Sequence, residues 1–176
     1  MTNTNDRIVD PSWFIRPDGY DASATIHGVG HTQRVRIHAA EIAEALGLAV
    51  WEREALDYAA MWHDIGRTHD HADYYHGAKS AGRVVGLGLH LGLDEPMVEV
   101  ALFAVTHHSG SEEHAKRALS WMVDPGAAWR VFTVLKDADT LDRVRLGAGD
   151  LDVSFLRHDV SAGRVERAWE LLREME

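Results

Sequence analysis

Apolar residues recur at steps of three and four along most of the chain, which is the spacing of amphipathic helices. One such stripe runs over residues 30–46 and ends at Gly47, and a second runs over residues 51–65 and ends at Gly66. Pro96 suits the first turn of a third helix that ends at His107 and His108. Further helices are expected over residues 79–89, 112–122, 127–146 and 161–175. No alternation of apolar and polar positions predicts a strand.

These stripes predict an all-α fold, a compact single-domain bundle of six or seven helices. Residues 1–26 carry prolines, Gly19 and several Asp and Asn, so we expect an irregular lead-in packed on the domain through Trp13 and Phe14. Residues 27–176 would form the helical domain. Trp62 and Trp121 are expected in its core, because aromatic residues in apolar helix faces usually serve burial.

Charge and composition narrow the partners. A net charge of −10 over 176 residues argues against binding a nucleic acid polymer, which needs many Lys and Arg, but it allows a small phosphorylated substrate. Without cysteine, only His, Asp and Glu remain as strong metal ligands. No signal peptide or membrane span is visible, so the sequence predicts a cytoplasmic protein with no membrane partner. Its oligomeric state stays open, a homodimer included.

Twelve histidines make a metal site worth testing, although any single histidine is more often a packed or solvated residue. His38 is read in that way, as a packed and hydrogen-bonded core residue. His63 and Asp64 differ because they end an apolar helix, where a buried carboxylate is costly unless a positive charge compensates it. A divalent cation would do so. Imidazole with carboxylate suits Mn, Fe, Co, Ni, Zn or Mg, so the metal is not identified.

A later helix offers three further carboxylates, Asp137, Asp139 and Asp142. All three lie in the segment VFTVLKDADTLDRV, where the apolar stripe marks the buried face. Spacing alone does not choose among them.

The ordered strings HGVGHTQRV, MWHDIGR and VLKDADTLDRV resemble the HD superfamily of metal-dependent phosphohydrolases, and His-Asp-Ile-Gly matches the signature of one subgroup. The resemblance covers about residues 28–144. It implies that the ligands are His31, His63, Asp64 and Asp139. Asp137 is the alternative for the last ligand and His27 for the first.

The resemblance further implies hydrolysis of a phosphate monoester or phosphoanhydride, in a nucleotide or a similar small metabolite, with Asp64 orienting the attacking water. Cations would meet the phosphate charge. The candidates are Arg67, Lys79, Arg34 and Arg143, each of which also fits a solvated surface charge.

His76 and the pair His107–His108 bear on the number of metals. Relatives with two-metal sites, such as the HD-GYP phosphodiesterases, have extra histidines between the His-Asp pair and the late Asp. This chain lacks the Gly-Tyr-Pro string of that group. One metal is slightly favoured, with these histidines binding phosphate or acting as acids. A second metal held by His76 and one of His107 or His108 is compatible with the sequence.

Two other functions compete with hydrolysis. Some members of the superfamily hold two irons and oxidise carbon substrates, which requires six protein ligands. A third hypothesis is a non-catalytic module that keeps the metal for structure and senses a ligand.

Overall fold

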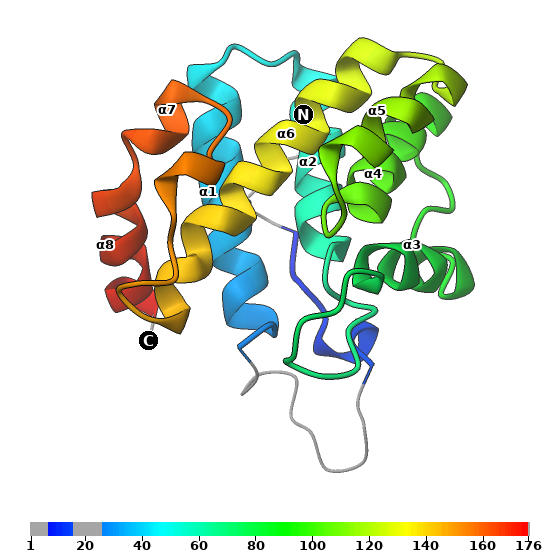
Figure 1. Cartoon of the computed structure of the whole chain (residues 1–176). Helices are drawn as coiled ribbons and strands as arrows, with labels where there is room; N and C mark the ends of the chain where they lie inside the picture. Colours follow the sequence, from blue (N-terminus) through cyan, green and yellow to red (C-terminus); the bar gives the residue numbers. More distant parts are fainter. Residues whose placement is uncertain (1–6, 16–25, 176) are drawn as a thin grey trace.

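The structure is a computed structural model that describes residues 7–15 and 26–175, and this part of the chain is helical without any strand. Figure 1 shows its eight α-helices. They are α1 (Val29–Ala45), α2 (Val50–Trp62), α3 (His76–Gly86), α4 (Glu95–His107), α5 (Glu112–Ala118), α6 (Pro125–Leu141), α7 (Asp159–Ala162) and α8 (Val165–Met175). Short 3-10 helices are η2 (Pro11–Trp13), η3 (Leu119–Trp121), η4 (Asp142–Leu146) and η5 (Val153–Phe155). The predicted all-α bundle is confirmed.

Four helices, α1, α2, α4 and α6, form the centre of the bundle. Helix α6 packs against each of the other three, and α1 against α2 and α2 against α4 complete the layer (Figure 1). Helix α3 packs on α4, while α8 lies on the opposite side against α1 and η4. The apolar stripes meet between these helices, where Ile42, Leu56, Phe132 and Leu135 are almost completely buried.

Local residues explain where these helices begin and end. The carboxylates of Asp94 and Asp124 accept hydrogen bonds from backbone amides of the first turns of α4 and α6, each of which also has a proline at its start. Gly47 follows α1 with φ of 69°, a left-handed conformation that glycine adopts without strain.

The chain from α6 to the C-terminal helix departs from the predicted ranges. The expected helix over residues 161–175 is divided into α7 and α8 around Gly163, and the chain after α6 continues as the 3-10 helix η4. This division is why eight helices stand where six or seven were expected.

Trp121 was expected in the core, and this prediction is wrong. The α-helix over residues 112–122 ends at Ala118, and the following 3-10 turn has a different number of residues per turn, so the α-helical spacing no longer applies. Trp121 is 86% exposed, whereas Trp62 is buried as predicted.

Two glycines let the segments that carry the histidines approach closely. A Cβ atom on Gly66 would lie 2.3 Å from the backbone nitrogen of Ser80 in α3, and one on Gly77 would lie 2.5 Å from the carbonyl oxygen of Val105 in α4. Neither position has room for a side chain. Gly66 therefore brings the turn after α2 against α3, and Gly77 brings the start of α3 against the end of α4.

Most of the predicted lead-in over residues 1–26 lies outside the described residues. Within residues 7–15, Val9 and Phe14 are buried, and the guanidinium of Arg83 donates hydrogen bonds to the carbonyl oxygens of Trp13 and Phe14. None of the described helices is long and apolar enough to cross a membrane.

Candidate metal centre

Histidine and aspartate side chains from five segments meet where the central helices end. His31 lies in the first turns of α1, His63 and Asp64 follow α2, and Asp139 lies in the last turn of α6. His76 begins α3 and His108 follows α4. All of these side chains are buried except Asp139, whose side chain is 34% exposed.

One side of the Asp64 carboxylate faces His31, His63 and Asp139, which we call the His31 group. The Nε2 atom of His31 lies 3.0 Å from Nε2 of His63, 3.4 Å from Oδ2 of Asp64 and 3.4 Å from Oδ1 of Asp139. The donor atoms of His31, His63 and Asp139 lie close enough together to hold one cation, and Oδ2 of Asp64 borders this group through His31.

The other side of Asp64 faces His76 and His108, which we call the His76 group. Oδ1 of Asp64 lies 3.1 Å from Nε2 of His76 and 3.7 Å from Nε2 of His108, and the two Nε2 atoms are 2.8 Å apart. These three residues also form a group of metal-ligand geometry. Asp64 therefore belongs to two sets of donors, one at each carboxylate oxygen.

The contacts of the Nδ1 atoms, on the side of each ring that faces away from Asp64, indicate which nitrogen of the four imidazoles carries a proton. Nδ1 of His63, His76 and His108 each contacts a backbone carbonyl three residues earlier, on Ala60, Asp73 and Val105. A carbonyl oxygen only accepts, so each of these Nδ1 atoms carries the proton. His31 directs its Nδ1 to the carboxylate of Asp142 at 2.7 Å. In their neutral forms, all four rings therefore turn an Nε2 lone pair toward Asp64.

Lone pairs placed in this way repel each other. Two neutral imidazoles with Nε2 atoms 2.8 Å apart, as in His76 and His108, have no hydrogen between them. The same holds for the 3.0 Å pair of His31 and His63 unless a proton bridges them. A cation coordinated by the nitrogens and by Asp64 turns both repulsions into attractions, so the donor arrangement fits metal ions.

The electrostatics agree with a site prepared for positive charge. Burial alone would raise the pKa of Asp64, yet His63, His108, His27 and His31 hold it well below its usual value. Burial and Arg145 disfavour protonation of His31, but hydrogen bonds to Asp139, Asp142 and Asp64 outweigh them and raise its pKa to about 9. Burial lowers the pKa of His63 to about 3. The carboxylates of the site are therefore ionised. The proton on His31 occupies a position that a cation would take.

Other predicted residues lie at different distances from the centre. Arg67 donates a hydrogen bond from Nε to Oδ1 of Asp64, at 3.1 Å. His27 places Nδ1 3.0 Å from Oδ2 of Asp64, and His27, His31 and Asp64 form a further group of metal-ligand geometry, so the structure keeps His27 as an alternative ligand on this side.

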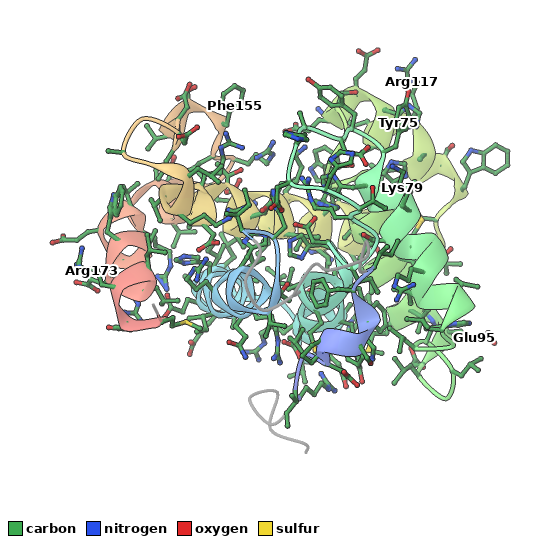
Figure 2. The ribbon with its side chains drawn as sticks, turned by 90° about the horizontal axis from the view of Figure 1, so that it is seen from below. Tyr75, Lys79, Glu95, Arg117, Phe155 and Arg173 are labelled. Atoms are coloured by element: carbon green, nitrogen blue, oxygen red, sulfur yellow. The ribbon has the colours of Figure 1, made fainter. Side chains whose placement is uncertain are left out.

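Three candidates point elsewhere. Lys79 is paired with Asp73 and lies near Tyr75 on the α3 side of the molecule (Figure 2). His107 stacks on Phe103 and His114 rather than joining His108. Asp137, the alternative late ligand, is buried and accepts hydrogen bonds from the backbone amides of Arg157 and His158. Asp139 is the late carboxylate that faces Nε2 of His31, while Asp142 contacts Nδ1 on the other side of the ring.

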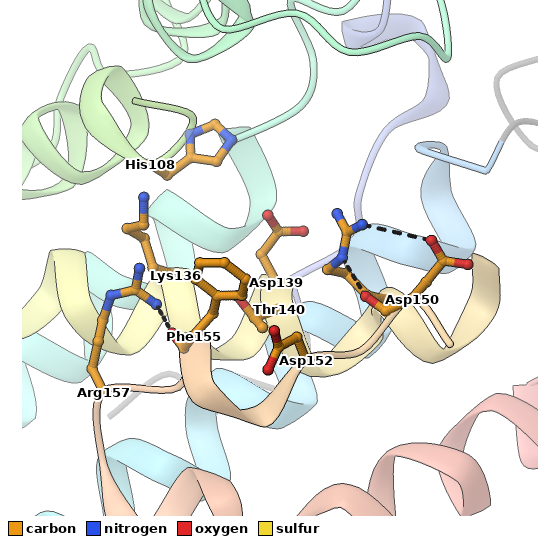
Figure 3. Close-up of a pocket in the computed structure, with 9 residues that line it drawn as sticks. His108, Lys136, Asp139, Thr140, Asp150, Asp152, Phe155 and Arg157 are labelled. Carbon is orange, nitrogen blue, oxygen red and sulfur yellow. Dashed lines mark hydrogen bonds and ion pairs between the residues drawn. The ribbon is translucent and has the colours of Figure 1, made fainter. Parts of the chain in front are cut away.

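A cavity of about 380 Å³ opens beside both donor groups (Figure 3). His108 and Asp139 line its inner end, and Lys136 points toward His108 from α6. Arg143 and Arg157 also line the cavity, but Arg143 pairs with Asp150 and Arg157 pairs with Glu112 and Asp137. Within the part of the chain that the structure describes, Lys136 makes no ion pair, and its Nζ donates to the carbonyl oxygen of Gly110.

Lys136 is not among the cations predicted from the sequence. Its position one turn before Asp139, on the same helix face, is the signal that could have indicated it. No family model, curated protein or solved structure matches the chain.

Proposed function

We propose that the protein is a hydrolase that cleaves a small phosphate monoester or phosphoanhydride with the help of two divalent metal ions that share Asp64. The observation that carries this proposal is the convergence of four Nε2 atoms and the carboxylates of Asp64 and Asp139. The sequence alone slightly favoured one metal. The pairing of His76 with His108 at Oδ1 of Asp64 supports two.

The ions would be held by side chains named above: His31, His63 and Asp139 with Oδ2 of Asp64, and His76 and His108 with Oδ1. When bound, such ions supply Lewis-acid stabilisation of phosphoryl oxygens and a more acidic water. Asp64, ionised and shared between the two groups, would orient the attacking water. Its low pKa suits a group that accepts hydrogen bonds and stays charged.

The substrate phosphate would enter through the cavity beside His108 and Asp139. Lys136 is placed to neutralise one of its oxygens, because its ammonium group has no carboxylate partner there. Arg67, held on Asp64, offers a second cation on the His76 side. A cavity of this size accepts a small metabolite or a nucleotide rather than a polymer.

A second function, oxidation of a carbon substrate by a di-iron centre, is favoured by the same donors. That reaction was expected to need six protein ligands, and His31, His63, Asp64, His76, His108 and Asp139 make six. Oxidation would require redox-active iron and uptake of O₂, whereas hydrolysis would proceed with Mn, Co, Mg or Zn as well.

One experiment separates the two functions. Metal-free protein is loaded with Mn, Co, Ni, Mg, Zn or Fe and is incubated with a panel of phosphorylated metabolites, while phosphate release and O₂ consumption are recorded together. Phosphate release with a redox-inert metal, absent in Asp64→Ala, supports the hydrolase. Activity only with iron, accompanied by O₂ consumption, would replace it by the oxygenase, and phosphate release by Asp64→Ala equal to that of the wild type would exclude the proposed mechanism.

A further inference from the structure

Asp142 forms a buried ionic network behind the His31 group. Its carboxylate is fully buried, yet it accepts hydrogen bonds from Nδ1 of His31 at 2.7 Å and from Nε and Nη2 of Arg34 at 2.6 and 3.1 Å. Nη1 of Arg145 lies 3.4 Å from the same carboxylate. A buried carboxylate with three cationic or donor partners is costly to assemble.

This network distinguishes His31 from the other three imidazoles. His63, His76 and His108 give their Nδ1 protons to neutral backbone carbonyls, and only His31 gives its proton to an anion. A carboxylate behind a metal-binding imidazole fixes the ring orientation and increases the electron density at the distal nitrogen. The two donor groups around Asp64 are therefore unequal in their surroundings as well as in their number of ligands.

Arg34 and Arg145 add rigidity to this arrangement. Because Arg34 holds both oxygens of Asp142, the carboxylate has little freedom to rotate away from His31. Arg145 also donates to the carbonyl oxygen of Ile26 and contacts Nδ1 of His27, so the start of α1 is fixed to the same network. His31 is thus held from behind and from its own helix terminus.

We propose that Asp142 is a positioning residue that makes the His31 group the tighter of the two metal sites, so that the two ions bind in a fixed order. The first ion would enter the His31 group, and the second would bind more weakly at His76 and His108. In the weaker site, the Nδ1 atoms of both imidazoles contact backbone carbonyls rather than a carboxylate, and Arg67 competes for Oδ1 of Asp64. This inference rests on the metal centre of the proposed function.

The test is calorimetric titration of the metal-free protein with Mn²⁺ and, separately, with Co²⁺, whose visible absorption reports its ligands. The wild type is expected to bind in two steps. In Asp142→Asn the first step should weaken by about 10- to 100-fold, because the amide does not offer acceptors to His31, Arg34 and Arg145 at once. The second step should keep its affinity. Asp150→Asn, which removes a carboxylate that contacts Arg143 but no histidine, is the matched control and should leave both steps unchanged.

Circular dichroism melting of the metal-free variants shows whether each one folds. Should Asp142→Asn unfold because Arg34 is left unpaired, the double variant Asp142→Asn, Arg34→Gln removes both charges and is titrated in its place. Equal first-step affinities in a folded variant and the wild type would overturn the role of Asp142 and leave the metal centre standing. Equal weakening of both steps would overturn it as well. A wild type that binds neither ion would instead overturn the metal centre, and the fixed order with it.

Discussion

The two sides of Asp64 are built from different kinds of structure. The His31 group lies on α1, α6 and the end of α2, three helices that pack on one another in the centre of the bundle. The His76 group lies at the start of α3 and the end of α4, and the connection from His63 to His76 runs partly through exposed polar residues. One carboxylate, that of Asp64, thus connects donors on the core helices with donors at the junction of two helix ends.

Removal of Asp64 tests what the two sides have in common. Asp64→Ala takes one ligand from each group and leaves four imidazoles without their shared anion, so both ions should be lost. Phosphate release should fall by at least about 10³-fold, since metal stabilisation of the transition state amounts to several kcal/mol. Elemental analysis and initial rates, measured in parallel, check this. Retention of one metal per chain in the variant would show that Asp64 is not the shared ligand.

His107 and His108 are neighbours in the sequence, but only His108 belongs to the His76 group, so variants of the two residues separate this group from the His31 group. His108→Ala should remove the second ion only and slow catalysis by about 100-fold, because the His31 group keeps all its ligands. His107→Ala is the matched control: His107 stacks on Phe103 and contacts no donor, so its metal content and rate should equal those of the wild type. The measurement is metal content after dialysis together with kcat. Loss of an ion in His107→Ala would mean that the roles of the two residues are exchanged.

The two sides also differ in their sensitivity to acid. Helix α1, which carries His31, also carries a buried histidine that belongs to neither donor group. Burial lowers the pKa of His38 to about 4, and among the residues that the structure describes its ring nitrogens have no hydrogen-bond partner. As the pH falls from about 6.5 toward 4, the unfolded chain takes up a proton that the folded chain does not, so the stability present at neutral pH is lost.

At pH 5 this loss should be about 2 kcal/mol. His38→Leu should lack it, which urea unfolding of metal-free protein at pH 8 and pH 5 measures. The control is the same pair of measurements on the wild type. Identical losses in the two proteins would mean that His38 is not the group that titrates.

The same contrast explains what the sequence could predict. The helices were predictable because their apolar spacing was regular, and the His63–Asp64 pair stood out because it ended such a helix. His31 and Asp139 depended on the resemblance to a known family, since spacing alone left Asp137, Asp139 and Asp142 open. The structure brings Asp139 to Nε2 of His31 and Asp142 to Nδ1 of the same ring, whereas Asp137 accepts a hydrogen bond from the backbone amide of Arg157.

The His76 group was harder to predict because its geometry depends on contacts between distant segments. His76 and His108 are 32 residues apart, and they meet because Gly77 lets α3 approach the carbonyl oxygen of Val105. Adjacent histidines in the sequence gave no means of choosing between His107 and His108. The choice follows from the end of α4, where the backbone turns the two rings in different directions. The exposure of Trp121 had a different origin, a local change of helix type that apolar spacing does not reveal.

The smallest predicted effect concerns Lys136, which serves the substrate rather than either metal. Lys136→Met keeps an unbranched side chain and removes the ammonium group, which lies 5.5 Å from the centroid of the Phe132 ring on a residue that lines the cavity. Since Lys136 should contact the phosphate before and during the reaction, KM should rise by about 10-fold with little change in kcat, the loss of one charge-assisted hydrogen bond. Metal content should not change. Lys79→Met, on the outer surface of α3, is the control and should leave KM unaltered. An unchanged KM in Lys136→Met would place the phosphate elsewhere, with Arg67 on the His76 side as the next residue to test.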